Sequence, residues 1–175
     1  MPLVKLNAGA ASVVDNEWVF AANDEDLPRE GKLVVCLSRY LADRDELQKL
    51  NRSIAVRLAP DDDPHELEPY LDSLSLIEVS FPKYVDGRGY SQAQLLRRRL
   101  GFSGELRAVG EVLRDQLFYM FRSGFDAFEF EPTSGEADVV TLSAINDFAN
   151  AYQKAADKRA PLFARRVSTP ADFKE

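Results

Sequence analysis

Apolar and polar residues alternate in blocks along most of this chain of 175 residues. Short, nearly continuous apolar runs occupy residues 32–37, 54–58, 77–81, 106–109 and 127–130. Runs of this kind are typical of strands that are covered on both faces of a parallel sheet. Stretches with the i, i+3, i+4 apolar spacing of helices occupy residues 44–50, 65–74, 91–100, 112–123 and 142–156.

This order predicts an α/β fold in which about five mainly parallel strands alternate with helices through right-handed crossovers. Two architectures satisfy the pattern: an incomplete (β/α) barrel and an open doubly wound sheet. Ahead of them, Val13 and Val14, an Asp-Asn turn and residues 18–20 predict a short N-terminal β-hairpin. We expect residues 1–31 to be a β extension of a single domain at 32–159, with a tail at 160–175.

Composition narrows the functional classes. The net charge of -7 argues against general binding to nucleic acid or to a membrane surface. No apolar stretch predicts a membrane span or a secretory leader, so we expect a cytoplasmic protein. Cys36 and His65 are the sole cysteine and histidine, and no nucleotide-binding fingerprint is present, so we expect no cofactor. Three acidic residues at 61–63 precede a proline, which favours a helix N-terminus over a metal site.

The loop at residues 83–91 contains the first candidate chemistry. Gly87 and Gly89 flank Arg88 and would let the backbone turn sharply towards a ligand. Ser91 is a good N-cap for the following helix, and free N–H groups there beside Arg88 would seat an anion or a phosphate. The alternative is that Asp86 and Arg88 only brace a tight turn.

A second polar group follows the run at 106–109, where Glu111, Arg114 and Asp115 open the next helix. Arg107 should point to the opposite side of its strand from Leu106. Either these residues form a structural salt-bridge network, or Arg88, Arg107 and Arg114 share the floor of a polar pocket. We expect the loops after neighbouring parallel strands to meet at one edge of the sheet. The candidate ligand-binding residues are therefore Asp86, Gly87, Arg88, Ser91, Arg107, Glu111, Arg114 and Asp115.

The stretch FPKYVDGRGYSQAQLLRRRLGFSGELRAVGEVLRDQLFYMFRSGFDAFEF, residues 81–130, resembles a bacterial family, domain of unknown function 934. The family pattern runs F-P-x-[FY]-x-D-G-R-[GA]-[YF]-S, then L-L-R-x-x-x-G-[YF]-x-G-E-[LI]-R-A-x-G-x-V-L-x-D-Q, then R-x-G-F-D-x-F. Matching positions here are Asp86, Gly87, Arg88, Ser91, Arg97, Gly104, Glu105, Arg107, Gly110, Asp115, Gln116 and Asp126. Members are typically encoded beside assimilatory sulfite reductase genes and are labelled probable oxidoreductases, so the resemblance implies a role in sulfite reduction. It supplies no catalytic residue.

Two hypotheses from different functional classes follow. In the first, the protein is an accessory factor of assimilatory sulfite reduction that binds the reductase or its electron donor. In the second, it is an enzyme or small-ligand binder that holds sulfite or a phosphorylated compound at the arginine-rich loops. The two differ in whether Arg88, Arg107 and Arg114 converge on an open pocket or are engaged in salt bridges. Because a sheet of this size leaves strand edges open, we also expect a homodimer.

Overall fold

The computed structural model describes residues 3–7, 10–129, 155–156 and 164. Eight strands form one sheet in the order β2-β1-β8-β7-β6-β5-β4-β3. Their bounds are β1 Leu3–Asn7, β2 Ala10–Val14, β3 Trp18–Ala21, β4 Lys32–Cys36, β5 Ile54–Leu58, β6 Leu76–Phe81, β7 Glu105–Gly110 and β8 Ala127–Glu129. Strands β3 to β8 run parallel to one another, and β1 runs antiparallel to both β8 and β2. The predicted parallel α/β sheet is confirmed, with three further strands at its edges.

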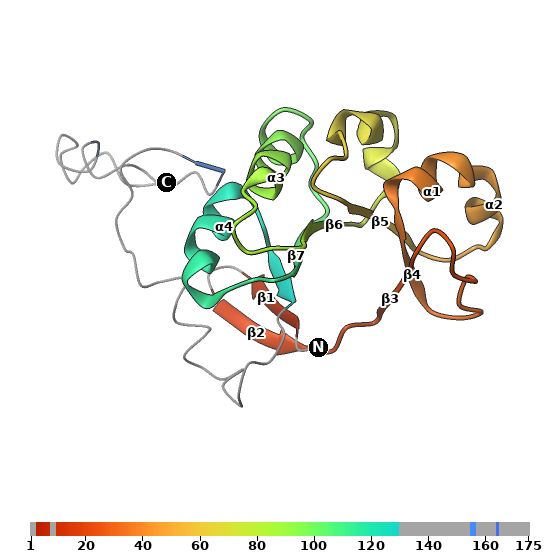
Figure 1. Cartoon of the computed structure of the whole chain (residues 1–175), viewed down its shortest axis with the longest axis horizontal. Coiled ribbons are helices and arrows are strands. Elements are labelled where there is room, and N and C mark those ends of the chain that lie inside the picture. The colour runs from red at the N-terminus through yellow and green to blue at the C-terminus, as the bar shows by residue number, and fades with distance from the viewer. Residues whose placement is uncertain (1–2, 8–9, 130–154, 157–163, 165–175) are drawn as a thin grey trace.

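The sheet curls into an open half-barrel, and the helices cover its convex side (Figure 1). A doubly wound sheet would have helices on both faces, whereas the described helices lie on one face of a curled sheet, as in the incomplete-barrel alternative. The helical elements are α1 Leu37–Ala42, α2 Arg44–Lys49, η1 Pro64–Ser73, α3 Arg88–Arg98, η2 Arg114–Gln116 and α4 Leu117–Ser123. No helix in the part of the chain that the structure describes is long and apolar enough to cross a membrane.

Several helices differ from their predicted form. The stretch predicted at 65–74 is the 3-10 helix η1, and Pro69 inside it has no N–H to donate to a regular α-helical ladder. The helix predicted at 112–123 begins with the short 3-10 turn η2 and continues as α4. Helix α1 follows β4 without a loop and was missed for that reason. The predicted helix at 142–156 and the tail at 160–175 lie almost entirely outside the described residues.

The N-terminal hairpin is present, but it joins β1 to β2, with Val13 opposite Val4. The predicted partner of Val13, the segment around Trp18, instead forms β3 at the far edge of the sheet and pairs in parallel with β4. Asn16 lies between β2 and β3, and its Oδ1 accepts the backbone N–H of Trp18, the first residue of β3, at 3.1 Å. Parallel pairing also lets Trp18 and Phe20 pack on Val34, so tertiary burial outweighs the local turn signal.

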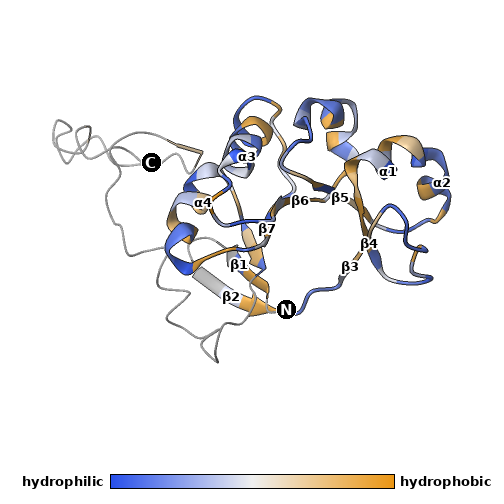
Figure 2. Cartoon of the chain, viewed as in Figure 1, coloured by the Kyte–Doolittle hydropathy of each residue, from blue (hydrophilic) through white to orange (hydrophobic). Residues whose placement is uncertain are grey.

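The main core lies between the sheet and its convex helical layer, where Ile77, Val79 and Leu106 pack against Leu96 and Leu117. Apolar residues follow the strands and the inner sides of the helices, and polar residues cover the outside (Figure 2). A smaller apolar cluster lies on the concave face. Its members are Val34, Ala55 and Leu76, with Trp18 and Phe20 packed against them.

Candidate functional site

The loops that follow β6 and β7 lie side by side at the carboxyl edge of the sheet. Oε2 of Glu111 accepts the backbone N–H of Tyr84 at 3.1 Å, and Nε2 of Gln116 donates to the carbonyl of Tyr84 at 2.7 Å. The backbone N–H of Glu111 also donates to the carbonyl of Phe81 at 2.8 Å. The two candidate loops are therefore neighbours, as the parallel topology predicts.

Arg88 is engaged by carboxylates at this edge. Its Nε donates to Oδ1 of Asp86 at 3.0 Å and its Nη2 donates to Oδ2 at 2.6 Å, which makes a two-point contact. Its Nη1 pairs with Asp61, which lies in the loop after β5. The hydrogen bonds from Arg88 lower the pKa of Asp86 from 3.8 to about 2. Arg88 thus ties together two loops, in the bracing arrangement that the sequence left open.

The start of α3 differs from the predicted anion seat. The helix begins at Arg88 after Gly87, so Ser91 lies within the first turn and does not cap it. The carboxylate of Asp86 accepts the backbone N–H of Arg88 at 3.1 Å and takes the place that an anion would occupy. A Cβ on Gly89 would come within 2.6 Å of Cζ of Phe81, so this glycine allows the helix to pack on β6.

Arg107 does not join this group. Its neighbour Leu106 packs into the convex core, so alternation along β7 directs Arg107 to the concave face, as predicted. There its Nη1 donates to Oε1 of Glu78 at 3.1 Å and to Oδ1 of Asn16 at 3.0 Å. Its Nη2 donates to Glu105 at 2.8 Å, and the side chain has no exposed surface. Arg107 also stands several residues before the end of its strand, too deep in the sheet to reach the loop edge.

The contacts of Arg107 belong to a row of charged residues that crosses the concave face. Arg57, Glu78 and Arg107 are direct cross-strand neighbours on β5, β6 and β7. Nε of Arg57 donates to Oε2 of Glu78 at 2.8 Å, and the Arg57 guanidinium lies 3.6 Å from the centre of the Phe20 ring. Burial raises the pKa of the Glu78 carboxyl, while Arg57 and Arg107 act to lower it.

A small cavity of about 200 Å³ opens on this face beside the row. Lys5, Glu17, Trp18, Lys32 and Arg107 are among the residues that line it. Lys5 pairs with Glu105 at 2.6 Å and Lys32 pairs with Glu17 at 2.6 Å, so the lining charges largely neutralise one another. The cavity therefore has no clear preference for an anion or a cation.

Sequence reasoning missed Arg57 and Glu78. The available signal was a charged residue inside each of three consecutive apolar runs, in AVRL, LIEVSF and LRAVG. A charge in a strand that is buried on both faces requires a partner, and the adjacent strands can supply one. Only the register shows that these three side chains meet.

The remaining candidates lie on the surface of the loop edge. Arg114 and Asp115 are exposed in the short turn η2, and Arg114 makes contacts of its own. The same segments expose apolar side chains: Tyr84 and Val85 from the β6 loop, Leu113 before η2 and Tyr119 on α4. Arg88, Arg107 and Arg114 therefore do not share one pocket, because Arg107 lies on the concave face.

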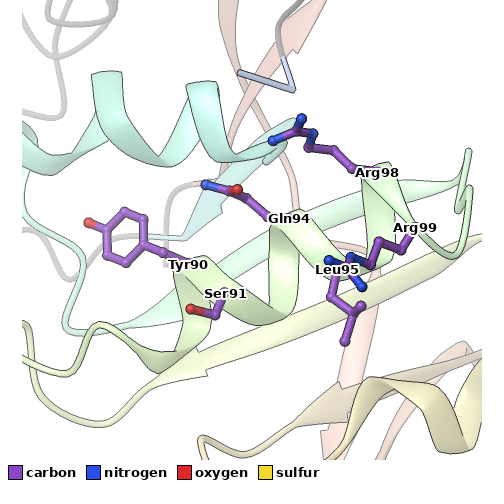
Figure 3. Close-up of a pocket in the computed structure, with 6 residues that line it drawn as sticks. All are labelled: Tyr90, Ser91, Gln94, Leu95, Arg98 and Arg99. Atoms are coloured by element: carbon purple, nitrogen blue, oxygen red, sulfur yellow. The ribbon is translucent and has the colours of Figure 1, made fainter. Parts of the chain in front are cut away.

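A shallow hollow of about 590 Å³ lies on the outer surface of α3. Tyr90, Gln94 and Arg98 point to one side of this helix, while Ser91, Leu95 and Arg99 point to another (Figure 3). The six side chains come from a single helix and diverge, so they do not close around a ligand. Among the described residues no group of three or more histidine, cysteine or acidic side chains could hold a metal ion.

The model of DUF934, a bacterial protein of unknown function, matches residues 55–163. The chain belongs to this family. No curated protein matches the sequence. The part matched by DUF934 begins within β5, so it contains the charged row and both loops of the carboxyl edge, whereas β1 to β4 precede it.

Proposed function

We propose that this DUF934 protein is a cytoplasmic accessory factor of assimilatory sulfite reduction, which binds sulfite reductase or its electron donor. The link to sulfite reduction rests on the resemblance of residues 81–130 to the DUF934 family. One structural observation supports a binding role. Arg88 and Arg107, two of the three arginines expected to hold a ligand, are engaged by carboxylates, whereas the segments at the loop edge expose a group of apolar side chains. The proposal assigns no catalytic residue.

The alternative function needs Arg88, Arg107 and Arg114 to face one anion. Arg88 already makes a two-point contact with Asp86 and pairs with Asp61. Arg107 is fully buried against Glu78 and Glu105 on a different face of the sheet. An incoming sulfite or phosphate would have to displace these carboxylates, so the geometry favours the binding role.

The docking surface would be the loop-edge patch, made of Tyr84, Val85, Leu113 and Tyr119, which are 51%, 70%, 42% and 55% exposed. Gln116 holds the two loops of the patch together, because its side chain bonds both the carbonyl of Tyr84 and the N–H of Leu113. Tyrosine and large aliphatic side chains on a fixed frame are typical of the centre of a protein interface. Glu111, which accepts the N–H of Tyr84, and Asp115 in η2 belong to the same segments as the patch and would suit a basic rim on the partner.

The direct test is binding between the purified protein and purified assimilatory sulfite reductase, or its electron-donor protein, measured by biolayer interferometry. We expect saturable binding by the wild type and a loss of about tenfold or more for Val85→Asp or Leu113→Asp, which place a charge in the interface. The same variants should slow growth on sulfate as the sole sulfur source.

The matched control is Leu50→Asp, since Leu50 is 42% exposed at the end of α2, away from the loop edge. It should bind and grow as the wild type does. The proposal is wrong if neither purified protein binds, or if the patch variants bind and grow normally.

We further propose a homodimer. Strands β2 and β3 are the two ends of the sheet, and they expose Val13 and Val19 at 50% and 46%. Open strand edges with exposed β-branched residues favour pairing with a second copy. Light scattering should give twice the mass of 19.7 kDa, and Val19→Lys should shift the protein towards the monomer. A monomer mass for the wild type at tens of micromolar would exclude a stable dimer.

A further inference from the structure

A second hollow, of about 510 Å³, lies at the amino ends of β5 and β6, opposite to the loop edge. It lies between α2, the segment that leads into β5, and the end of η1. We call it the basic pocket, because the described residues that line it include Arg44 and Arg52 and no acidic residue. The hollow on α3 also contains two arginines, but the lining of the basic pocket comes from several elements instead of a single helix.

The two arginines have unused hydrogen-bond donors. Nε of Arg44 and Nε of Arg52 are buried and have no hydrogen-bond partner. Nη1 of Arg52 donates to the carbonyl of Pro28 at 2.6 Å, which fixes the position of the side chain. The structure shows no ion pair of either arginine with a described carboxylate. A buried charged donor without a partner is costly, which points to a partner that arrives from outside.

The orientation of Arg44 is also fixed. Its guanidinium lies 4.2 Å from the centre of the Tyr70 ring, and Tyr70 in turn makes an edge contact with Tyr40. Stacking on an aromatic face holds the planar fork while leaving its edge free to donate hydrogen bonds. An arginine held in this way loses little side-chain entropy when an anion binds.

Neutral donors complete the lining. Ser53 and Ser75 line the basic pocket, and their hydroxyls make no hydrogen bond with the described residues. Gln48 adds an amide from α2, and Leu47 and Ile54 contribute an apolar wall. The pocket is larger than a single tetrahedral oxyanion needs and has the volume of typical small-molecule sites.

We propose that the basic pocket binds a small molecule through a phosphate or sulfate group held by Arg44 and Arg52. Two guanidinium forks match the geometry of a tetrahedral oxyanion, and the serine hydroxyls would take its remaining oxygens. The body of the ligand would lie against the wall formed by Leu47 and Ile54. This site is independent of the loop-edge patch, since it lies at the other end of the strands.

Isothermal titration calorimetry of the full chain with inorganic phosphate, inorganic sulfate, adenosine monophosphate and adenosine tests this. We expect the wild type to bind phosphate or sulfate with a Kd of about 1 mM or tighter. Arg44→Gln and Arg52→Gln should each weaken binding by about tenfold or more. Tighter binding of the monophosphate than of phosphate, with no binding of adenosine, would identify a phosphate ester of nucleotide size. Equal binding would indicate the free oxyanion.

Two further variants keep the test decisive. Ser75→Asp places a carboxylate in the pocket without removing the bond from Arg52 to Pro28, and it should also abolish binding. Arg99→Gln, which changes the exposed C-cap residue of α3, should bind as the wild type does. The proposal is overturned if no oxyanion binds saturably, or if the Arg44, Arg52 and Ser75 variants, folded by circular dichroism, bind as tightly as Arg99→Gln.

Discussion

Arg107 lies directly opposite Glu78 on the neighbouring parallel strand, and its Nη1 donates to Oε1 of Glu78 at 3.1 Å. The two side chains are 0% and 1% exposed, so their charges are compensated only within the row, where Glu78 also pairs with Arg57 and Arg107 also pairs with Glu105. Removal of one member of such a buried pair destabilises the protein, because the remaining charge is buried away from water.

We therefore predict that Arg107→Met reduces the free energy of unfolding by about 3–5 kcal/mol. Urea denaturation followed by circular dichroism measures the change. The double variant Glu78→Leu with Arg107→Met should be more stable than Arg107→Met alone, because the buried carboxylate that keeps only Arg57 is also gone, and Arg57 is 24% exposed and can be hydrated. If the double variant loses the sum of the two single losses, the pair does not have the coupling that we infer.

The two glycines that flank Arg88 should respond differently to substitution. Gly89→Ala would place a Cβ within 2.6 Å of Phe81 and 3.0 Å of Val79, so it should cost about 1–3 kcal/mol through overpacking. Gly87 has a φ of -81° and open space around it, so Gly87→Ala should change stability by about 0.5 kcal/mol or less. Thermal melting of both variants provides the comparison. Equal effects would mean that α3 does not pack on β6 as described.

Two arginines at the end of α3 provide a second matched pair, since Arg97 lies in its last turn and Arg99 is its C-cap. Nε of Arg97 donates to the carbonyl of Gly124 at 2.8 Å, and its Nη1 donates to those of Phe102 and Gly104 at 2.6 and 2.8 Å. Arg97→Met should destabilise the protein by about 2–4 kcal/mol, since these acceptors lose a charged donor. Arg99→Ala, on the exposed side of the helix, should stay within about 0.5 kcal/mol in the same chemical denaturation experiment. A neutral Arg97→Met would contradict the role of Arg97 in fixing these loops.

The pairing of Arg88 with Asp86 predicts a pH dependence. The pKa of Asp86 is lowered to about 2, below its value of 3.8 in an unfolded chain. The ionised form therefore contributes stability above about pH 4, and this contribution is lost as the pH falls through about 2. The stability difference between the wild type and Asp86→Asn, measured as urea midpoints, should shrink over that interval. Asp72→Asn, which removes an exposed carboxylate without an ion pair among the described residues, should show no such trend.

Much of the fold followed from local pattern. The five parallel strands match their predicted ranges closely, because a short apolar run bounded by polar loops is typical of a buried strand. The neighbouring loops with Tyr84 and Glu111 also followed, since parallel strands bring consecutive carboxyl ends to one edge. The strand that pairs with Val13 could not be predicted from local pattern. A turn signal between two strands is also compatible with strands that lie at opposite edges of a sheet.

The sequence by itself determined the strand runs, the side of β7 that Arg107 takes, and the family, because each of these depends on residues close together in the chain. Only the tertiary structure decided that the helices cover one face of a half-barrel, that Arg107 pairs with Glu78, and that Arg88 pairs with Asp61. It alone also brought Arg44 and Arg52 into one hollow. These outcomes depend on strand register and sheet curvature, and both are set by side-chain packing summed over the whole sheet.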